Sequence, residues 1–295
     1  MKLFKGSAVA IITPFQDGQI DIETFKQLVT WHVKEGTQAL IVTGTTGESA
    51  TLNHEEKLTL YRAALESAQG KVPVIANTGT NNTAESIHLS KAAEAIGVDG
   101  LLVVTPYYNK PNQAGMAAHF RAIAKSVTIP IILYNVPSRT GVNLEAKTLG
   151  ELARNTNIVA IKEAAGDLEQ VRAMIANTPD DFALYSGNDD LYLETLRCGG
   201  DGVISVVANL EPAASQKLYT SYLEDDTAAT RIQERLDILN DVLFIAPNPV
   251  PVKTALEHLG VPVGGTRLPL VGLDETENRQ LLAALDAYGL KVISL

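Results

Sequence analysis

Short apolar runs recur along the chain at a nearly regular spacing, and they are the first feature that predicts a fold. Eight of them have the length of buried strands: residues 8–12, 39–42, 74–76, 101–104, 131–133, 159–161, 182–184 and 203–207. Between them lie stretches of helical periodicity, such as the one that places Phe25, Leu28 and Val29 on one face behind Asp21. A second helix is expected behind Asn53, which can form a capping box with Glu56.

Uninterrupted apolar strands that alternate with helices are typical of a parallel sheet covered on both faces. The eight units favour a closed (β/α)8 TIM barrel, an α/β fold, with a doubly wound sheet as the alternative. After residue 210 the pattern changes, and helices are expected near residues 213–223, 230–244, 252–259 and 275–288 without a further strand. We therefore predict a catalytic barrel over residues 1–224 and a C-terminal helical domain over residues 225–295.

Charge and composition exclude several classes of partner. The chain carries 24 basic and 34 acidic residues, a net charge of −10, so nucleic acid and anionic membranes are not expected to bind. The apolar run at residues 8–12 is too short for a signal or membrane segment. A lone Cys198 cannot form an internal disulfide, which favours a cytoplasmic protein.

Polar residues follow the predicted strands, and two of them end adjacent strands, close enough for a phenol to exchange protons with an amine or its adduct. Lys162 follows the run at residues 159–161, and Tyr134 follows the run at residues 131–133. In a parallel barrel the carboxyl ends of the strands meet on one face, where such enzymes place their sites. An amine that attacks a carbonyl must first lose its proton, which burial favours. Lys162 is thus a candidate nucleophile beside a tyrosine, the alternative being a lysine that extends to solvent.

Two further segments are candidate carboxylate sites. The backbone and hydroxyls of Gly44-Thr45-Thr46-Gly47 can form a small anion-binding nest, although a plain glycine turn is the alternative. Arg139 can bind a second carboxylate through two parallel hydrogen bonds, unless it is only a surface arginine. Two anion sites around an amine indicate an oxo-acid substrate.

Motifs for metals and cofactors are missing from the sequence. The five histidines all fall in or beside predicted helices, and the helix that begins near His54 lacks the second histidine of a zinc-binding helix. No Gly-x-Gly-x-x-Gly fingerprint follows a strand, and no Gly-x-Ser-x-Gly elbow is present. We therefore expect neither a catalytic metal nor a cofactor.

Four motifs together resemble one enzyme family along the chain from Gly6 into the helical tail. They are Gly44-Thr45-Thr46-Gly47-Glu48-Ser49, Thr105-Pro106-Tyr107-Tyr108-Asn109, the segment from Tyr134 to Gly141, and Ile161-Lys162-Glu163. In these residues the chain resembles the dihydrodipicolinate synthase and N-acetylneuraminate lyase superfamily of pyruvate-dependent aldolases. The double threonine, Arg139 and the segment Pro247-Asn248-Pro249-Val250-Pro251-Val252-Lys253 resemble its synthase branch.

The resemblance implies a lyase with a class I aldolase mechanism. Lys162 would form a Schiff base with pyruvate, and the resulting enamine would attack the aldehyde of L-aspartate 4-semialdehyde. Ring closure would then release 4-hydroxy-tetrahydrodipicolinate, in the first committed step of lysine and diaminopimelate biosynthesis. The roles implied for the other residues are a proton relay for Tyr134, Thr45 and Tyr108, binding of the pyruvate carboxylate for Thr46, binding of the semialdehyde for Arg139, and pocket lining for Gly187 and Ile204.

The resemblance also implies assembly and regulation. In the family, Tyr108 would reach a neighbouring subunit's site, so a homo-oligomer is expected, commonly a homotetramer built as a dimer of dimers. Lysine-inhibited members bind L-lysine at a subunit interface through residues that resemble Ser49, Ala50, Leu52, His54, Asn81, Glu85 and Tyr107. Glu85 can pair with an α-ammonium group, unless Glu85 and His54 are only solvated residues at helix starts. Lys57 stands where many inhibited members carry histidine.

Two other functions fit parts of the pattern. A related lyase that acts on N-acetylneuraminate or on 2-keto-3-deoxy sugar acids would use the same Lys162 and Tyr134, but Arg139 argues against it. A catalytically silent binding or regulatory barrel is the alternative from another class. The intact set of Lys162, Tyr134, Thr45 and Tyr108 argues against a silent barrel.

Overall fold

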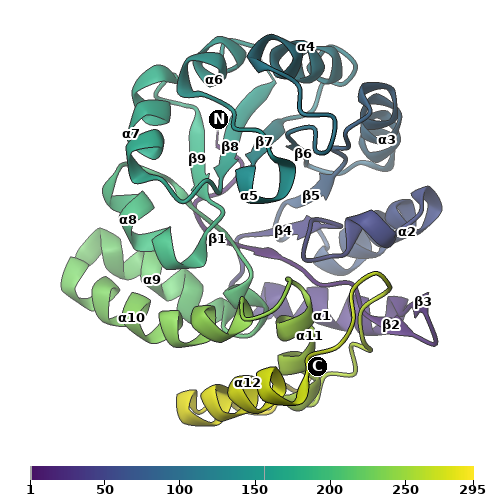
Figure 1. The fold of residues 1–295 in the computed structure, drawn as a ribbon, viewed down its shortest axis with the longest axis vertical. Coiled ribbons are helices and arrows are strands. Elements are labelled where there is room, and N and C mark those ends of the chain that lie inside the picture. The colour runs from purple at the N-terminus through teal and green to yellow at the C-terminus, as the bar shows by residue number, and fades with distance from the viewer. Residues whose placement is uncertain (1, 156) are drawn as a thin grey trace.

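The chain folds into a closed barrel of parallel strands surrounded by helices, as a computed structural model shows for residues 2–155 and 157–295 (Figure 1). The barrel strands are β1 Gly6–Ala10, β4 Ala39–Val42, β5 Val74–Asn77, β6 Gly100–Val104, β7 Ile131–Asn135, β8 Ile158–Glu163, β9 Ala183–Ser186 and β10 Gly202–Ser205. Strand β1 closes the barrel by pairing in parallel with both β4 and β10. The predicted (β/α)8 barrel is confirmed, and the doubly wound alternative is wrong.

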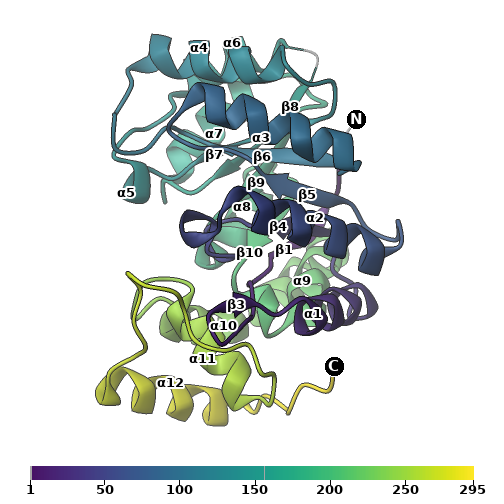
Figure 2. The same ribbon diagram turned by 90° about the vertical axis from the view of Figure 1, so that its right-hand side faces the viewer.

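Helices cover the outside of the barrel and continue beyond its last strand (Figure 2). The helices that follow barrel strands are α1 Ile22–Lys34, α2 His54–Ala68, α3 Thr83–Ile96, α4 Gln113–Ala124, α5 Pro137–Thr140, α6 Ala146–Leu152, α7 Leu168–Asn177, α8 Tyr192–Arg197 and α9 Pro212–Glu224. Helix α2 begins with the predicted capping box, because the Asn53 side chain accepts from the Glu56 amide and Glu56 accepts from the Asn53 amide.

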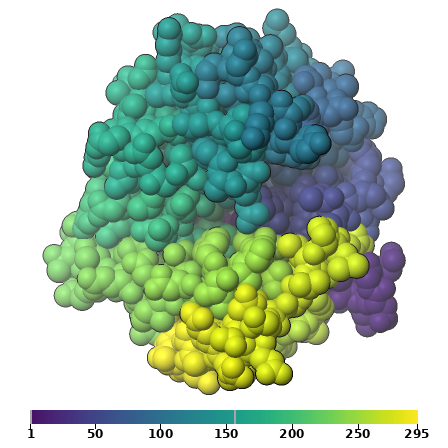
Figure 3. Space-filling view, in the orientation of Figure 1, coloured from purple at the N-terminus to yellow at the C-terminus, as the bar shows by residue number. Residues whose placement is uncertain are grey.

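Three helices form the C-terminal segment: α10 Asp226–Leu243, α11 Val250–His258 and α12 Glu275–Tyr288. In the space-filling view they form the green and yellow part of the molecule below the barrel (Figure 3). Helix α10 packs against α9, α11 and α12, and it is one of the elements that attach the segment to the barrel. We propose the division of the chain into two domains at residues 224 and 225, between α9 and α10. No helix in the described part of the chain is long and apolar enough to cross a membrane.

Several boundaries differ from the predicted ones. Helix α10 begins four residues before the predicted start at 230, because the Asp225 carboxylate caps it by accepting from the amides of Thr227 and Ala228. Strand β10 ends at Ser205, and the rest of the predicted run turns into the 3-10 helix Val207–Asn209. The hairpin of β2 Phe15–Gln16 and β3 Gln19–Ile20 was not predicted, since strands of two residues carry no periodicity.

The barrel interior is a separate apolar layer below the carboxyl ends of the strands. Small and branched side chains fill it, and the rings of Phe4 and Tyr185 stack with centroids 4.1 Å apart. Along β8, Ala160 points into this interior, whereas Ile161 packs outward against the helices. The alternation of a strand then directs the side chain of Lys162 inward.

Candidate active site

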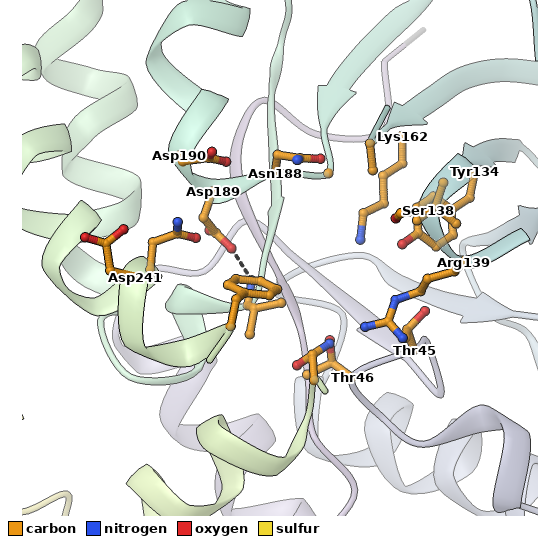
Figure 4. A pocket seen from close by; sticks show the side chains of 17 residues that line it. Thr45, Thr46, Tyr134, Ser138, Arg139, Lys162, Asn188, Asp189, Asp190 and Asp241 are labelled. Carbon is orange, nitrogen blue, oxygen red and sulfur yellow. Dashed lines mark hydrogen bonds between the residues drawn. The ribbon is translucent and has the colours of Figure 1, made fainter. Parts of the chain in front are cut away.

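Lys162 and Tyr134 lie side by side on neighbouring strands. They are paired in the register of β7 and β8, as their positions in the sequence predicted. The Lys162 Nζ atom lies 4.5 Å from the centroid of the Tyr134 ring. Both side chains are only 6% exposed, and no ion pair of Lys162 occurs within the part of the chain that the structure describes. Figure 4 shows the amine extending into a cavity.

The next pair of residues along these strands fixes the relative position of the two strand ends. The Asn135 Nδ2 atom donates to both carboxylate oxygens of Glu163, at 3.2 and 3.0 Å, and the Ala165 amide donates to the same carboxylate at 2.6 Å. Burial raises the pKa of the Glu163 carboxyl, and these hydrogen bonds oppose that shift. Because neighbouring residues of a strand point to opposite faces, this contact supports Lys162 and Tyr134 without entering the cavity.

Gly187 gives Lys162 the space that its side chain occupies. A Cβ atom on Gly187 would lie 2.9 Å from Lys162 Cε and 2.7 Å from Ala164 Cβ. Any larger residue would therefore displace the amine. This is a steric reason for glycine, and it supports the inclusion of Gly187 among the candidate site residues.

The cavity above Lys162 has a volume of about 400 Å³. Its lining joins strand ends of the barrel to the C-terminal segment: Thr45, Thr46, Tyr134, Val136, Ser138, Arg139, Lys162, Ala164, Gly187, Asn188, Asp189, Asp190, Val206, Asn240, Asp241, Phe244 and Asn248. In Figure 4 the cations Lys162 and Arg139 lie on one side, and three aspartates lie on the other. A cavity with both signs of charge suits a substrate that carries a carboxylate and an ammonium group.

The double-threonine loop forms a tight turn at the end of β4. The Glu48 amide donates to the Thr45 carbonyl at 3.1 Å, and the Asn248 side chain donates to the Thr46 hydroxyl at 3.0 Å. Gly47 has little free space around it in this turn. A Cβ atom on Gly47 would lie only 3.0 Å from the Cα atom of Thr43, so this glycine permits the close packing of the turn.

Arg139 lies on the short helix α5, next to the end of β7. Its side chain is exposed, and no ion pair of Arg139 occurs among the described residues. It lines the cavity, and Figure 4 shows its guanidinium group directed toward Thr45. The group is therefore available to bind a carboxylate in the cavity.

Two of the predicted site residues do not join this cavity within the chain. Tyr108 is 89% exposed, with a left-handed backbone at φ 71°, and it does not line the cavity. Ile204 is fully buried in the barrel interior and also lies outside the lining. The structure thus brings Thr45, Thr46, Tyr134, Arg139, Lys162 and Gly187 together.

The residues of the proposed lysine site lie around the starts of α2 and α3. A second cavity of about 330 Å³ includes Ser49, Ala50, Lys57 and Tyr107 in its lining, and it shares Thr45, Tyr134, Val136, Arg139 and Asn248 with the cavity above Lys162. The His54 Nδ1 atom lies 3.8 Å from a carboxylate oxygen of Glu85. Of the other members, Leu52 is buried, and the Asn81 carbonyl accepts from Asn109 at 2.9 Å. Burial lowers the pKa of the Lys57 ammonium, and the negative charge of Glu85 opposes this shift.

Asp189 is a cavity residue that the sequence did not single out. Its carboxylate accepts from the Ser205 hydroxyl and, at 2.8 Å, from the Val206 amide. Burial raises the pKa of Asp189, whereas these hydrogen bonds and the charge of Lys162 lower it. The polar residues at the end of β9, just before Asp189, are the feature of the sequence that could have indicated it. Among the described residues, no group of three or more histidine, cysteine, aspartate or glutamate side chains is placed to hold a metal ion.

Comparisons with known proteins agree on one family. The model of the dihydrodipicolinate synthetase family matches residues 3–288. The chain is 47% identical over 292 residues to the 4-hydroxy-tetrahydrodipicolinate synthase of Thermoanaerobacter sp. (strain X514), with 98% of each chain covered. The structure of dihydrodipicolinate synthase from Cyanidioschyzon merolae with lysine bound is 43% identical and has a TM-score of 0.96, covering 98% of this chain and 100% of that chain. A structure described as the first monomeric dihydrodipicolinate synthase variant is 42% identical, also with a TM-score of 0.96 and 98% of each chain covered.

Proposed function

The chain belongs to the dihydrodipicolinate synthetase family, and we propose that Lys162 is the amine with which it performs the family's reaction. That reaction condenses pyruvate with L-aspartate 4-semialdehyde to 4-hydroxy-tetrahydrodipicolinate, in lysine and diaminopimelate biosynthesis. The observation that carries the proposal is the buried Lys162 amine, which lies 4.5 Å from the Tyr134 ring at the floor of the cavity.

The first half of the reaction forms an imine. The neutral Lys162 amine attacks the keto carbon of pyruvate, and the hydroxyl of the adduct leaves as water after it gains a proton. Tyr134 donates this proton and Thr45 relays it; both residues line the cavity around Lys162, which supports these roles. The Thr46 hydroxyl, which accepts a hydrogen bond from the Asn248 side chain, binds the pyruvate carboxylate.

The second half forms the new carbon–carbon bond and frees the enzyme. Loss of a methyl proton converts the imine to an enamine, whose carbon attacks the aldehyde of the semialdehyde. The amino group of the same substrate then replaces Lys162 at the imine carbon, which closes the ring and regenerates the amine. Arg139 holds the semialdehyde carboxylate through both steps.

A comparison of two aldehydes tests this assignment of substrate. Purified protein is supplied with pyruvate and either aspartate semialdehyde or N-acetylmannosamine, and product formation is followed by mass spectrometry. Turnover of aspartate semialdehyde is expected. Condensation with the sugar alone would instead support the sugar-acid lyase.

Replacing Arg139 by methionine is expected to raise the KM for aspartate semialdehyde by about 10-fold to 100-fold. The reason is the loss of a charge-assisted contact with the carboxylate of that substrate. Steady-state kinetics with each substrate varied in turn measures the effect, and Arg172→Met, the same change on the exposed surface of α7, is the control. Equal increases in the KM for pyruvate and for the semialdehyde would contradict the assigned role.

For assembly, we propose that the chain forms a homo-oligomer, specifically a homotetramer. In this assembly Tyr108 of one subunit reaches the active site of a neighbouring subunit. The exposed position of Tyr108 supports this proposal, because within its own chain it does not line the cavity. The similar monomeric variant indicates that the fold itself does not depend on assembly.

Mixing two inactive variants tests the exchange of Tyr108 between subunits. Tyr108→Phe is expected to lower kcat by about 100-fold, because a proton-transfer group is lost. Subunits with Tyr108→Phe and subunits with Lys162→Met are unfolded together and refolded, and activity is expected to return in the mixed oligomers. Sedimentation gives the size of the active species. If no activity returns from a mixture that does form mixed oligomers, Tyr108 acts in its own chain.

We also propose that L-lysine inhibits the enzyme by binding at Glu85 and its neighbours. A similar dihydrodipicolinate synthase has lysine bound, and here Glu85 offers an exposed carboxylate beside His54. Glu85→Gln is expected to weaken inhibition by about 10-fold, because an ion pair with the lysine ammonium is lost. Initial rates over a range of L-lysine concentrations measure this, with Glu55→Gln on the same surface as the control. Unchanged inhibition in Glu85→Gln would place the lysine site elsewhere.

A further inference from the structure

A buried ion pair connects the C-terminal segment to the double-threonine loop. The Nζ atom of Lys253, on α11, lies 2.9 Å from Oε1 of Glu48, and the two side chains are only 2% and 1% exposed. The same ammonium donates to the carbonyls of Thr13 and Gly265, at 2.9 and 2.6 Å. It also lies 4.3 Å from the centroid of the Phe15 ring. All three of its protons therefore have acceptors within the protein.

The second carboxylate oxygen of Glu48 is held by the C-terminal segment as well. The Arg267 amide donates to Oε2 of Glu48 at 3.0 Å. The Arg267 guanidinium donates to the Thr51 carbonyl at 2.9 Å and forms an ion pair with Glu56. Arg267 therefore contacts Glu48 and also two residues that follow Glu48 in the chain. Both oxygens of this carboxylate thus receive hydrogen bonds from residues more than 200 positions later in the chain.

The double-threonine loop ends at Glu48, and its backbone conformation is one that contacts with the rest of the protein must hold in place. Thr43 and Glu48, at its two ends, have left-handed conformations with φ of 54° and 55°. A left-handed conformation is unfavourable for residues other than glycine, above all for a β-branched residue such as threonine. It persists where the surrounding structure holds it in place, and such positions gather at functional sites. Between these two residues lie Thr45 and Thr46, which line the cavity.

We infer that Lys253 is a positioning residue: through its ion pair with Glu48 it holds Thr45 and Thr46 in the positions from which they act in the cavity. The inference rests on the roles proposed above for the two threonines. A buried ion pair adds little net stability, because removing both charges from water offsets most of their attraction. Burial accordingly lowers the pKa of Lys253, and the adjacent Glu48 opposes that shift. The Lys253–Glu48 ion pair is therefore better explained by its effect on the conformation of the double-threonine loop than by a gain in stability.

A double substitution separates positioning from folding. Lys253→Met alone would leave the Glu48 carboxylate buried without its cation, which can prevent folding. The variant Lys253→Met with Glu48→Gln removes both charges at nearly constant volume. In this double variant kcat is expected to fall and the KM for pyruvate to rise, each by about 10-fold, because small displacements of a catalytic group are costly. The thermal midpoint and the circular dichroism spectrum confirm that the variant is folded.

The control removes an ion pair of similar length at the other end of the barrel. Lys2 lies 2.6 Å from Asp201, before the first and last barrel strands, and Lys2→Met is expected to leave both kinetic constants unchanged. For each variant, the condensation rate is divided by the number of active sites that form a reduced pyruvate adduct with borohydride. If the wild type traps no pyruvate, the proposed function is wrong. If it traps pyruvate but the folded double variant keeps wild-type kcat and KM per trapped site, the positioning role is wrong.

Discussion

Replacing Lys162 by methionine is expected to abolish condensation, lowering kcat by about four orders of magnitude or more. Methionine fits the apolar surroundings of this strand end but has no amine to attack pyruvate. Since the ammonium has no ion-pair partner among the described residues, its removal is not expected to lower thermal stability. Initial rates with saturating pyruvate and aspartate semialdehyde measure the loss.

The exposed Lys147 provides the matched control for this experiment. Lys147→Met makes the same chemical change on a helix surface away from the cavity, so wild-type rates are expected. A folded Lys162→Met variant that keeps more than a few per cent of the wild-type kcat would contradict an imine at this residue.

Replacing Tyr134 by phenylalanine is expected to lower kcat by about 100-fold to 1,000-fold. The ring and its contact with the Lys162 amine remain, but the hydroxyl that moves protons during imine formation is lost. The imine is therefore expected to form slowly rather than not at all. Stopped-flow measurement of imine formation, together with kcat, separates this effect from a loss of pyruvate binding.

Tyr192 provides a buried tyrosine for comparison. Its hydroxyl has no hydrogen-bond partner among the described residues, so Tyr192→Phe removes the same atom without breaking a contact. Its kinetic constants are expected to match those of the wild type. A Tyr134→Phe variant with equally normal rates of imine formation would exclude the tyrosine from the proton relay.

The barrel and the central pair of the site could be predicted from local patterns. Apolar runs separated by helical periodicity require a parallel sheet, and in a barrel consecutive strands become neighbours. Lys162 and Tyr134 follow consecutive runs, so their pairing in β7 and β8 followed from their order in the sequence. The match of the family model over residues 3–288 agrees with the motifs around them.

The contacts that support the site could not be predicted in this way. Glu48 and Lys253 are 205 positions apart, and Thr46 and Asn248 are 202 apart. No periodicity records which distant loops meet, because such contacts depend on how the C-terminal segment packs on the barrel. The start of α10 was missed for a smaller reason, since the capping role of Asp225 lies outside the apolar pattern. The close packing of Gly47 likewise depends on backbone atoms of Ile11 and Thr43, the residues that directly follow β1 and β4.

The most direct test of the account is chemical trapping of the imine. The protein is incubated with pyruvate, reduced with borohydride, digested and mapped by peptide mass spectrometry. The account predicts a reduced pyruvate adduct on Lys162 and none when pyruvate is omitted. An active enzyme that yields no adduct, or an adduct only on another lysine, would contradict it.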